Sequence, residues 1–127
     1  MFLEHVNMTV SDLDRSIDFY TKLLGFKVRW RGETSDGSPA AHVGDDRCFL
    51  ALFQATAEGK VPNDYATPGL NHFGFVVDDL DAARGRVAEL GAKVHAEMDY
   101  DPGRRVYLFD PDGIEVELVE YARDTKS

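Results

Sequence analysis

The sequence is 127 residues long, which is enough for one domain with a core of ordinary size. Hydrophobic residues make up 43% and charged residues 29%, the proportions of a globular rather than a disordered protein. The formal net charge of −9 disfavours binding to nucleic-acid phosphates or anionic lipid. Apolar runs are far shorter than the roughly 20 residues that span a bilayer, and the segment after Met1 is unlike a signal peptide. We therefore expect a cytoplasmic protein without nucleic-acid or membrane partners.

An internal repeat organises the chain. Residues 3–14 read LEHVNMTVSDLD and residues 70–81 read LNHFGFVVDDLD, so the second segment repeats the first, with His72 at the position of His5. Further along, Gly91 repeats Gly25 after the loss of a single residue within the second helix region. The junction lies near 55–69, where Ala, Gly, Pro, Asn and Thr cluster. These features predict a single domain over 1–127, built from modules at about 1–55 and 69–121.

The first module begins with a strand over about 3–10, in which apolar and polar residues alternate. Ser11 or Asp12 then caps a helix that Gly25 ends. The apolar residues of that helix recur at helical spacing: Leu13, Ile17, Tyr20 and Leu24. Three further strands are predicted at about 26–34, 38–43 and 47–54.

The second module repeats this order, with a strand over 70–77, a helix over 79–90 and strands near 93–99, 104–109 and 114–120. A module buries little by itself, whereas two modules side by side can share one interior. The predicted fold class is α+β: two tandem βαβββ modules that form a curved, barrel-like mixed sheet around a central cavity.

Strand alternation predicts which side chains enter that cavity. With the apolar residues facing the helices, the first strand directs His5, Asn7 and Thr9 inward. The strand over 70–77 directs His72 inward, and the last strand directs Glu117 inward. A single inward histidine in a strand is usually a hydrogen-bonded core residue. His5 and His72 hold equivalent positions in the repeat, and this favours a shared site instead.

Two imidazoles and one carboxylate predict a divalent metal site. The residue that corresponds to Glu117 in the first module is Ala51, so the site offers three ligands and an open position. This is the arrangement of a catalytic metal, because structural sites are usually closed. The set suits Fe, Mn, Zn or Ni. His42 and His95 lack such support and are interpreted as surface or rim residues. Glu115, beside Glu117, is interpreted as a solvated rim residue, with a group that contacts and supports a metal ligand as the alternative.

Three segments of the chain resemble the vicinal-oxygen-chelate superfamily: HVNMTVSDLDRSIDFYTKLLGFKV, LNHFGFVVDDLDAA and YLFDPDGIEVELVE. This superfamily includes glyoxalase I, methylmalonyl-CoA epimerase, fosfomycin-resistance proteins, extradiol dioxygenases and bleomycin-binding proteins. The resemblance implies paired βαβββ modules, usually in a homodimer, and metal ligands at His5, His72 and Glu117.

Departures from the family patterns bear on the type of reaction. Glyoxalase I carries a glutamate where Ala51 stands, so a three-ligand site resembles the fosfomycin-resistance proteins and extradiol dioxygenases more closely. Val106-Tyr107, followed by DPDG and Glu117, matches the second half of the extradiol signature, although the preceding histidine is absent. Arg104 and Arg105 could meet an anionic substrate, as in the fosfomycin-resistance proteins, but the potassium-binding loop of the thiol-transferring members is absent.

We therefore predict a metal-dependent enzyme whose small-molecule substrate chelates the ion through two adjacent oxygens. It would act as a ring-cleaving dioxygenase or as a lyase, isomerase or transferase. Tyr107 is predicted as an acid/base or hydrogen-bonding group, with an ordinary buried hydrogen bond as the alternative. The predicted substrate-binding residues are Asn7, Thr9, Phe49, Phe53 and Arg105.

The alternative function is a metal-free protein that sequesters a drug or metabolite, as bleomycin-resistance relatives do. Those proteins generally dispense with the metal ligands, so the presence of all three favours the enzyme. An inert relative with a vestigial site is a third interpretation. The sequence leaves open the substrate, the native metal, the use of dioxygen, and whether the modules pair within a chain or across a dimer.

Overall fold

The computed structural model describes residues 1–60 and 64–122. The chain divides into two compact units, Met1–Lys60 and Val61–Ser127, and each is described by itself. Two tandem modules are thus present as predicted, and their predicted bounds stay a prediction. Their pairing into a single domain around a shared cavity stays a prediction.

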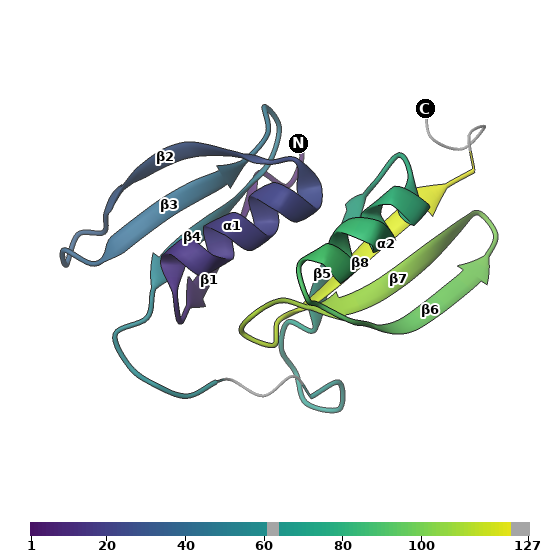
Figure 1. The fold of residues 1–127 in the computed structure, drawn as a ribbon. Coiled ribbons are helices and arrows are strands. Elements are labelled where there is room, and N and C mark those ends of the chain that lie inside the picture. Colours follow the sequence, from purple (N-terminus) through teal and green to yellow (C-terminus); the bar gives the residue numbers. More distant parts are fainter. Residues whose placement is uncertain (61–63, 123–127) are drawn as a thin grey trace. The chain divides into compact units, whose positions relative to one another are not determined.

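Both units have the predicted βαβββ order (Figure 1). The elements of the first unit are β1 (His5–Val10), α1 (Leu13–Leu24), β2 (Lys27–Glu33), β3 (Pro39–Gly44) and β4 (Phe49–Gln54). Those of the second are β5 (His72–Val76), α2 (Leu80–Glu89), β6 (Val94–Tyr100), β7 (Gly103–Phe109) and β8 (Glu115–Tyr121).

Each unit contains one mixed four-stranded sheet. The strand orders are β1-β4-β3-β2 and β5-β8-β7-β6. The first strand of each unit pairs in parallel with the last, and the remaining pairs are antiparallel. The predicted α+β class is confirmed, with each sheet curved and open rather than closed into a barrel (Figure 1).

Both helices begin at an aspartate cap, and a glycine follows each of them, directly after α1 and one residue later after α2. Asp12 Oδ1 accepts a hydrogen bond from the backbone N–H of Arg15 at 3.1 Å, so Asp12 rather than Ser11 is the N-cap of α1. Asp79 Oδ1 caps α2 by accepting from Ala82 N at 3.0 Å. Gly25 and Gly91 follow the helices with φ of 70° and 74°, a conformation that glycine adopts without strain.

A second connection repeats between the last strand and the helix start of each unit. Gln54 Oε1 accepts from the backbone N–H of Leu13 at 2.9 Å. At the corresponding position of the second unit, Glu120 Oε1 accepts from Leu80 N at 2.7 Å. Both side chains satisfy a helix N–H that has no partner within the helix, and so connect the helix to the sheet.

The apolar residues gather between each helix and its sheet. In β1, Met8 and Val10 are buried while His5, Asn7 and Thr9 are exposed, as alternation predicts. In β8, Val116 and Leu118 are completely buried. The opposite side of each sheet, here called the open face, therefore carries the polar residues predicted to form a site.

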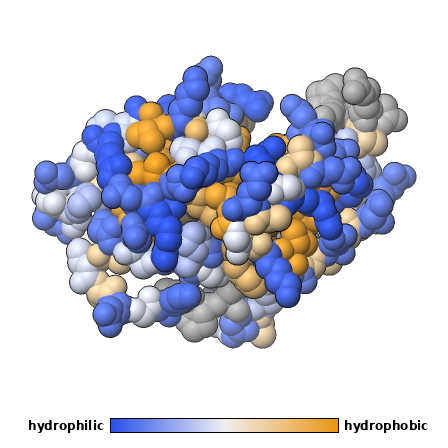
Figure 2. All heavy atoms as spheres, viewed as in Figure 1, coloured by the Kyte–Doolittle hydropathy of each residue, from blue (hydrophilic) through white to orange (hydrophobic). Residues whose placement is uncertain are grey.

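Hydrophilic residues cover most of the molecular face shown in Figure 2. Among the described residues, no helix is long and apolar enough to cross a membrane.

Candidate metal and substrate site

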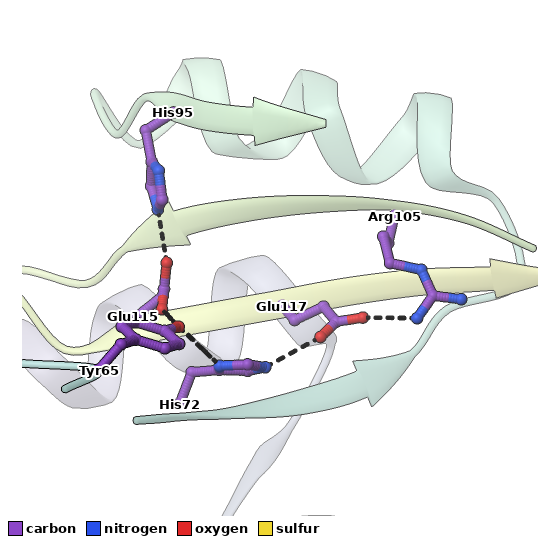
Figure 3. A network of polar contacts seen from close by, with 6 residues as sticks. All are labelled: Tyr65, His72, His95, Arg105, Glu115 and Glu117. Atoms are coloured by element: carbon purple, nitrogen blue, oxygen red, sulfur yellow. Dashed lines mark hydrogen bonds and ion pairs between the residues drawn. The ribbon is translucent and has the colours of Figure 1, made fainter. Parts of the chain in front are cut away.

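His72 and Glu117 face one another on the open face of the second sheet (Figure 3). His72 Nε2 lies 3.0 Å from Glu117 Oε1. Their strands are neighbours, and the register pairs Gly74 with Glu117, two residues beyond His72. Because Gly74 has no side chain, the imidazole of His72 and the carboxylate of Glu117 can approach each other along the same face.

The second carboxylate oxygen of Glu117 is bound by Arg105. Arg105 Nη1 lies 3.2 Å from Glu117 Oε2, and each side chain is only 13% exposed. The guanidinium carbon of Arg105 also lies 4.6 Å from the centre of the Tyr100 ring. Glu117 thus presents one oxygen to His72 and the other to a fixed cation.

The other ring nitrogen of His72 is held by Tyr65 and Glu115. The Tyr65 hydroxyl lies 2.9 Å from His72 Nδ1 and donates a hydrogen bond to Glu115 Oε1. Glu115 Oε1 is itself 3.7 Å from His72 Nδ1. The hydrogen bond to Glu115 raises the pKa of the Tyr65 hydroxyl to about 12, so the hydroxyl keeps its proton at neutral pH.

His95 binds the remaining oxygen of Glu115. His95 Nε2 lies 2.9 Å from Glu115 Oε2, and the His95 ring stacks on Phe109 with centres 4.3 Å apart. The Glu115 side chain is only 7% exposed. Its interpretation as a solvated rim residue was wrong, because a buried carboxylate requires such partners.

Tyr107 packs against the same histidines. Its ring meets His72 edge-on at 5.4 Å between centres and lies 6.3 Å from His95. Burial, and then the charge of Glu117, raise the pKa of the Tyr107 hydroxyl. Tyr107 is therefore a protonated hydrogen-bond donor at neutral pH beside His72 and Glu117.

The first unit places aromatic groups on its open face. The His5 ring stacks on Phe49 with centres 4.9 Å apart, and His5 Nδ1 lies 2.9 Å from Glu4 Oε1. His42 lies between Phe49, at 4.5 Å, and Trp30, at 4.9 Å. The rings of His5, Phe49, His42 and Trp30 thus form a continuous series, here called the aromatic row.

The remaining predicted contact residues of this unit vary in exposure. Asn7 Nδ2 donates to the backbone carbonyl of Ala51 at 2.9 Å, so its amide is partly committed to joining β1 and β4. Thr9 is exposed and Phe53 is partly buried. Ala51 pairs with Asn7 just as Glu117 pairs with Gly74, which confirms that Ala51 is the counterpart of Glu117.

The family model described as Glyoxalase/Bleomycin resistance protein/Dioxygenase superfamily matches residues 2–118. The chain belongs to this superfamily. A crystal structure of a glyoxylase/bleomycin resistance protein/dioxygenase domain from Frankia sp. EAN1pec superimposes with a TM-score of 0.81 at 28% identity, covering 97% of this chain and 93% of that one.

Relatives within the superfamily differ in activity. The chain is 33% identical to the lactoylglutathione lyase of Escherichia coli O157:H7, over 94% of this chain and 93% of that protein. It is 28% identical to the glutathione transferase FosA of Serratia marcescens, over 91% and 78%. It is 26% identical to the catechol-2,3-dioxygenase of Bacillus subtilis over 90% of this chain, but spans only 39% of that protein. It likewise spans 35% of a probable chloroplastic lactoylglutathione lyase of Arabidopsis thaliana. Membership of the superfamily supports an enzyme that acts on a small molecule.

Sequence reasoning predicted some of the residues that form the candidate site. It predicted that His5, His72 and Glu117 line one cavity, and it added Tyr107 and Arg105 as site residues. In the structure His72, Glu117, Arg105 and Tyr107 lie together on the open face of the second sheet. His5 lies beside Phe49 on that of the first. Sequence reasoning missed the contacts of Tyr65, Glu115 and His95. The role of His5, His72 and Glu117 as a common ligand set stays a prediction, because His5 belongs to the first unit and the other two to the second.

Proposed function

We propose that this superfamily member is a metal-dependent enzyme in which His5, His72 and Glu117 bind one divalent ion. The observation that carries the proposal is the 3.0 Å approach of His72 Nε2 to Glu117 Oε1 on an open sheet face. An imidazole nitrogen and a carboxylate oxygen are ligands that first-row ions share. Each has a second partner that fixes its position: Tyr65 contacts Nδ1 of His72, and Arg105 contacts Oε2 of Glu117.

His5 fits the role of third ligand by its chemistry and position in the repeat. Its Nδ1 contacts Glu4, as the Nδ1 of His72 contacts Tyr65, so Nε2 is in both histidines the ring nitrogen left to bind a metal, and in His72 it already faces Glu117. Over the described residues, no three histidine, cysteine, aspartate or glutamate side chains group closely enough to hold a metal. The proposed site therefore needs His5 from the first unit in addition to the pair in the second. It would be supplied by the same chain or by a partner in the homodimer expected from the family resemblance.

The residues around the ligands have distinct proposed roles. Bound there, a divalent ion would act as a Lewis acid toward two adjacent oxygens of the substrate. Tyr107 donates a hydrogen bond to such an oxygen, and Arg105 supplies positive charge beside the ligands for an anionic group of the substrate. The aromatic row offers a flat, apolar surface for the substrate body. In this proposal the second unit binds the polar groups of the substrate, and the aromatic row of the first unit binds its apolar body.

Ala51 bears on the type of reaction. Its methyl group stands where a fourth oxygen ligand would be needed for a symmetric site, and it is 5% exposed. We infer a three-ligand metal with open coordination positions, which favours dioxygenase or transferase chemistry over that of the lactoylglutathione lyases. Fe, Mn, Zn and Ni all suit the donor set.

The aromatic row supports a second candidate, sequestration of a planar drug or metabolite without turnover. The two functions separate in one experiment. The chain is loaded with Fe(II), Mn(II), Zn(II) or Ni(II) and assayed with catechol, with fosfomycin and glutathione, and with methylglyoxal and glutathione. We expect turnover of at least one substrate by the wild type and none by His72→Ala, with Glu89→Gln, an exposed helix carboxylate, as the control. Tight ligand binding that both proteins share, without turnover, would establish sequestration instead.

A further inference from the structure

We propose that Tyr65, Glu115 and His95 are positioning residues that fix the ring orientation and tautomer of His72, so that Nε2 is the atom offered to a metal. The inference rests on the proposed function, because it assigns a role toward the metal that His72 would bind. It concerns residues outside the predicted ligand set, one of which comes from the segment between the two modules.

The direction of the hydrogen bonds assigns the tautomer. A tyrosine hydroxyl has a single proton, and Tyr65 donates it to the carboxylate of Glu115. The same oxygen can then only accept from His72 Nδ1, at 2.9 Å. His72 therefore carries a proton on Nδ1. Nε2 is the other ring nitrogen, 3.0 Å from Glu117 Oε1, and a metal bound there would take the place of a proton between the two atoms (Figure 3).

Glu115 is the centre of this arrangement. One of its oxygens receives the Tyr65 hydroxyl near His72, and the other binds His95 Nε2 at 2.9 Å. A carboxylate that is 7% exposed has few alternative partners, so its position is defined by these contacts. His95 is held in turn by its stacking on Phe109, at an interplanar angle of 11°.

The segment that carries Tyr65 is shaped by Asp64. Asp64 Oδ1 accepts from Ala66 N at 2.9 Å, and Asp64 Oδ2 accepts from the Thr67 hydroxyl at 2.6 Å. This turn presents Tyr65 with its ring largely exposed and its hydroxyl in contact with Glu115 and His72. The contact places a residue of the inter-module segment directly behind a predicted ligand.

In this arrangement the surrounding residues contact the metal ligand His72 rather than the metal itself. Metal-binding histidines usually donate their second ring N–H to a carboxylate, carbonyl or water, and loss of that partner weakens metal affinity about 10- to 100-fold. In this chain the partner is the Tyr65 hydroxyl, with the charge of Glu115 behind it. In the first module, position 49 corresponds to Glu115 and is Phe49, so His5 stacks on a ring instead.

The test measures zinc affinity by competition with a chromophoric chelator, in the full chain. Tyr65→Phe keeps the ring and removes only the hydroxyl, and Glu115→Gln keeps the shape and removes the charge. We expect both to weaken zinc binding about 10-fold or more. Tyr121→Phe is the matched control, because the Tyr121 hydroxyl makes no hydrogen bond within residues 1–60 and 64–122. Its affinity should stay within about 2-fold of wild type.

Proton–nitrogen correlation of histidine-labelled, zinc-loaded protein gives a second readout, which simple loss of packing would not alter. His72 of the wild type should show a proton on Nδ1 that exchanges slowly with water, and Tyr65→Phe should lose that protection while its thermal midpoint changes little. Unchanged zinc affinity and unchanged protection in Tyr65→Phe overturn this inference and leave the proposed function intact. Failure of the wild type to bind zinc, manganese, iron or nickel overturns both.

Discussion

Glu117 and Arg105 illustrate how a single, largely desolvated ion pair organises the open face of the second unit. Both side chains are 13% exposed, and Glu117 also meets His72. Removing one partner from such a pair leaves the other charge poorly compensated, which costs more than the pair contributes. The exposed pair Arg84–Glu97 lies in solvent, where ion pairs contribute little.

These two pairs predict different effects on stability. Arg105→Gln should lower the free energy of unfolding by about 2 kcal/mol or more, because Glu117 then lacks its cation. Arg84→Gln should lower it by less than about 1 kcal/mol. Urea denaturation of both variants at pH 7 measures the difference. Equal losses would contradict a structural role for the Arg105–Glu117 contact.

The residues that the sequence did not predict lie where periodicity fails. Alternation along β5 and β8 was enough to bring His72 and Glu117 together, because both strands are regular. His95 lies at a register shift between Val94 and Ala96, where alternation no longer assigns a face. Tyr65 lies in a loop, whose side-chain directions follow no repeat. Glu115 could be placed inward, but its burial depends on those two unpredicted partners.

At the scale of elements, helix and strand order followed from the repeat, the caps and the apolar periodicity. The parallel pairing of the first and last strand within each unit could not be predicted in this way, because pairing partners are set by three-dimensional packing. The shared role of Gln54 and Glu120 was not predicted either: each lies on the last strand of its unit and binds a helix N–H. Their equivalent positions in the internal repeat are the signal that could have revealed it.

Glu120 predicts a pH-dependent contribution to stability. The backbone N–H of Leu80, and then Arg104, lower the pKa of Glu120 below its ordinary value of 4.5. A carboxylate with a lowered folded-state pKa stabilises the fold above its unfolded pKa, and this stabilisation is lost as the pH falls through the folded value.

Glu120→Gln should therefore be less stable than the wild type at pH 7, and the difference should shrink below about pH 4.5. Urea denaturation at pH 7 and at pH 3 measures both values. Glu89→Gln, which removes an exposed carboxylate that makes no ion pair among the described residues, serves as the control for general acid effects. A difference that grows as the pH falls would contradict the assignment.

At the scale of the whole molecule, duplication has produced two units with the same topology and different open faces. Positions that hold His72, Glu115 and Glu117 in the second unit hold His5, Phe49 and Ala51 in the first. One histidine is kept in each unit, while both carboxylates are replaced by apolar residues. The duplication and the presence of Ala51 in place of Glu117 were evident from the sequence, whereas the contacts of Tyr65, Glu115 and His95 became clear only from the structure.

The central claim is that ligands from both units bind one metal ion. The most direct measurement is metal per chain, by elemental analysis after anaerobic reconstitution and removal of free ions. It compares the wild type with His5→Ala, His72→Ala and Glu117→Gln, and with Glu89→Gln as the control. We predict about one equivalent of metal in the wild type and the control, and a loss in each of the three ligand variants. Full metal content in His5→Ala, or a metal-free wild type with every ion, would contradict the account.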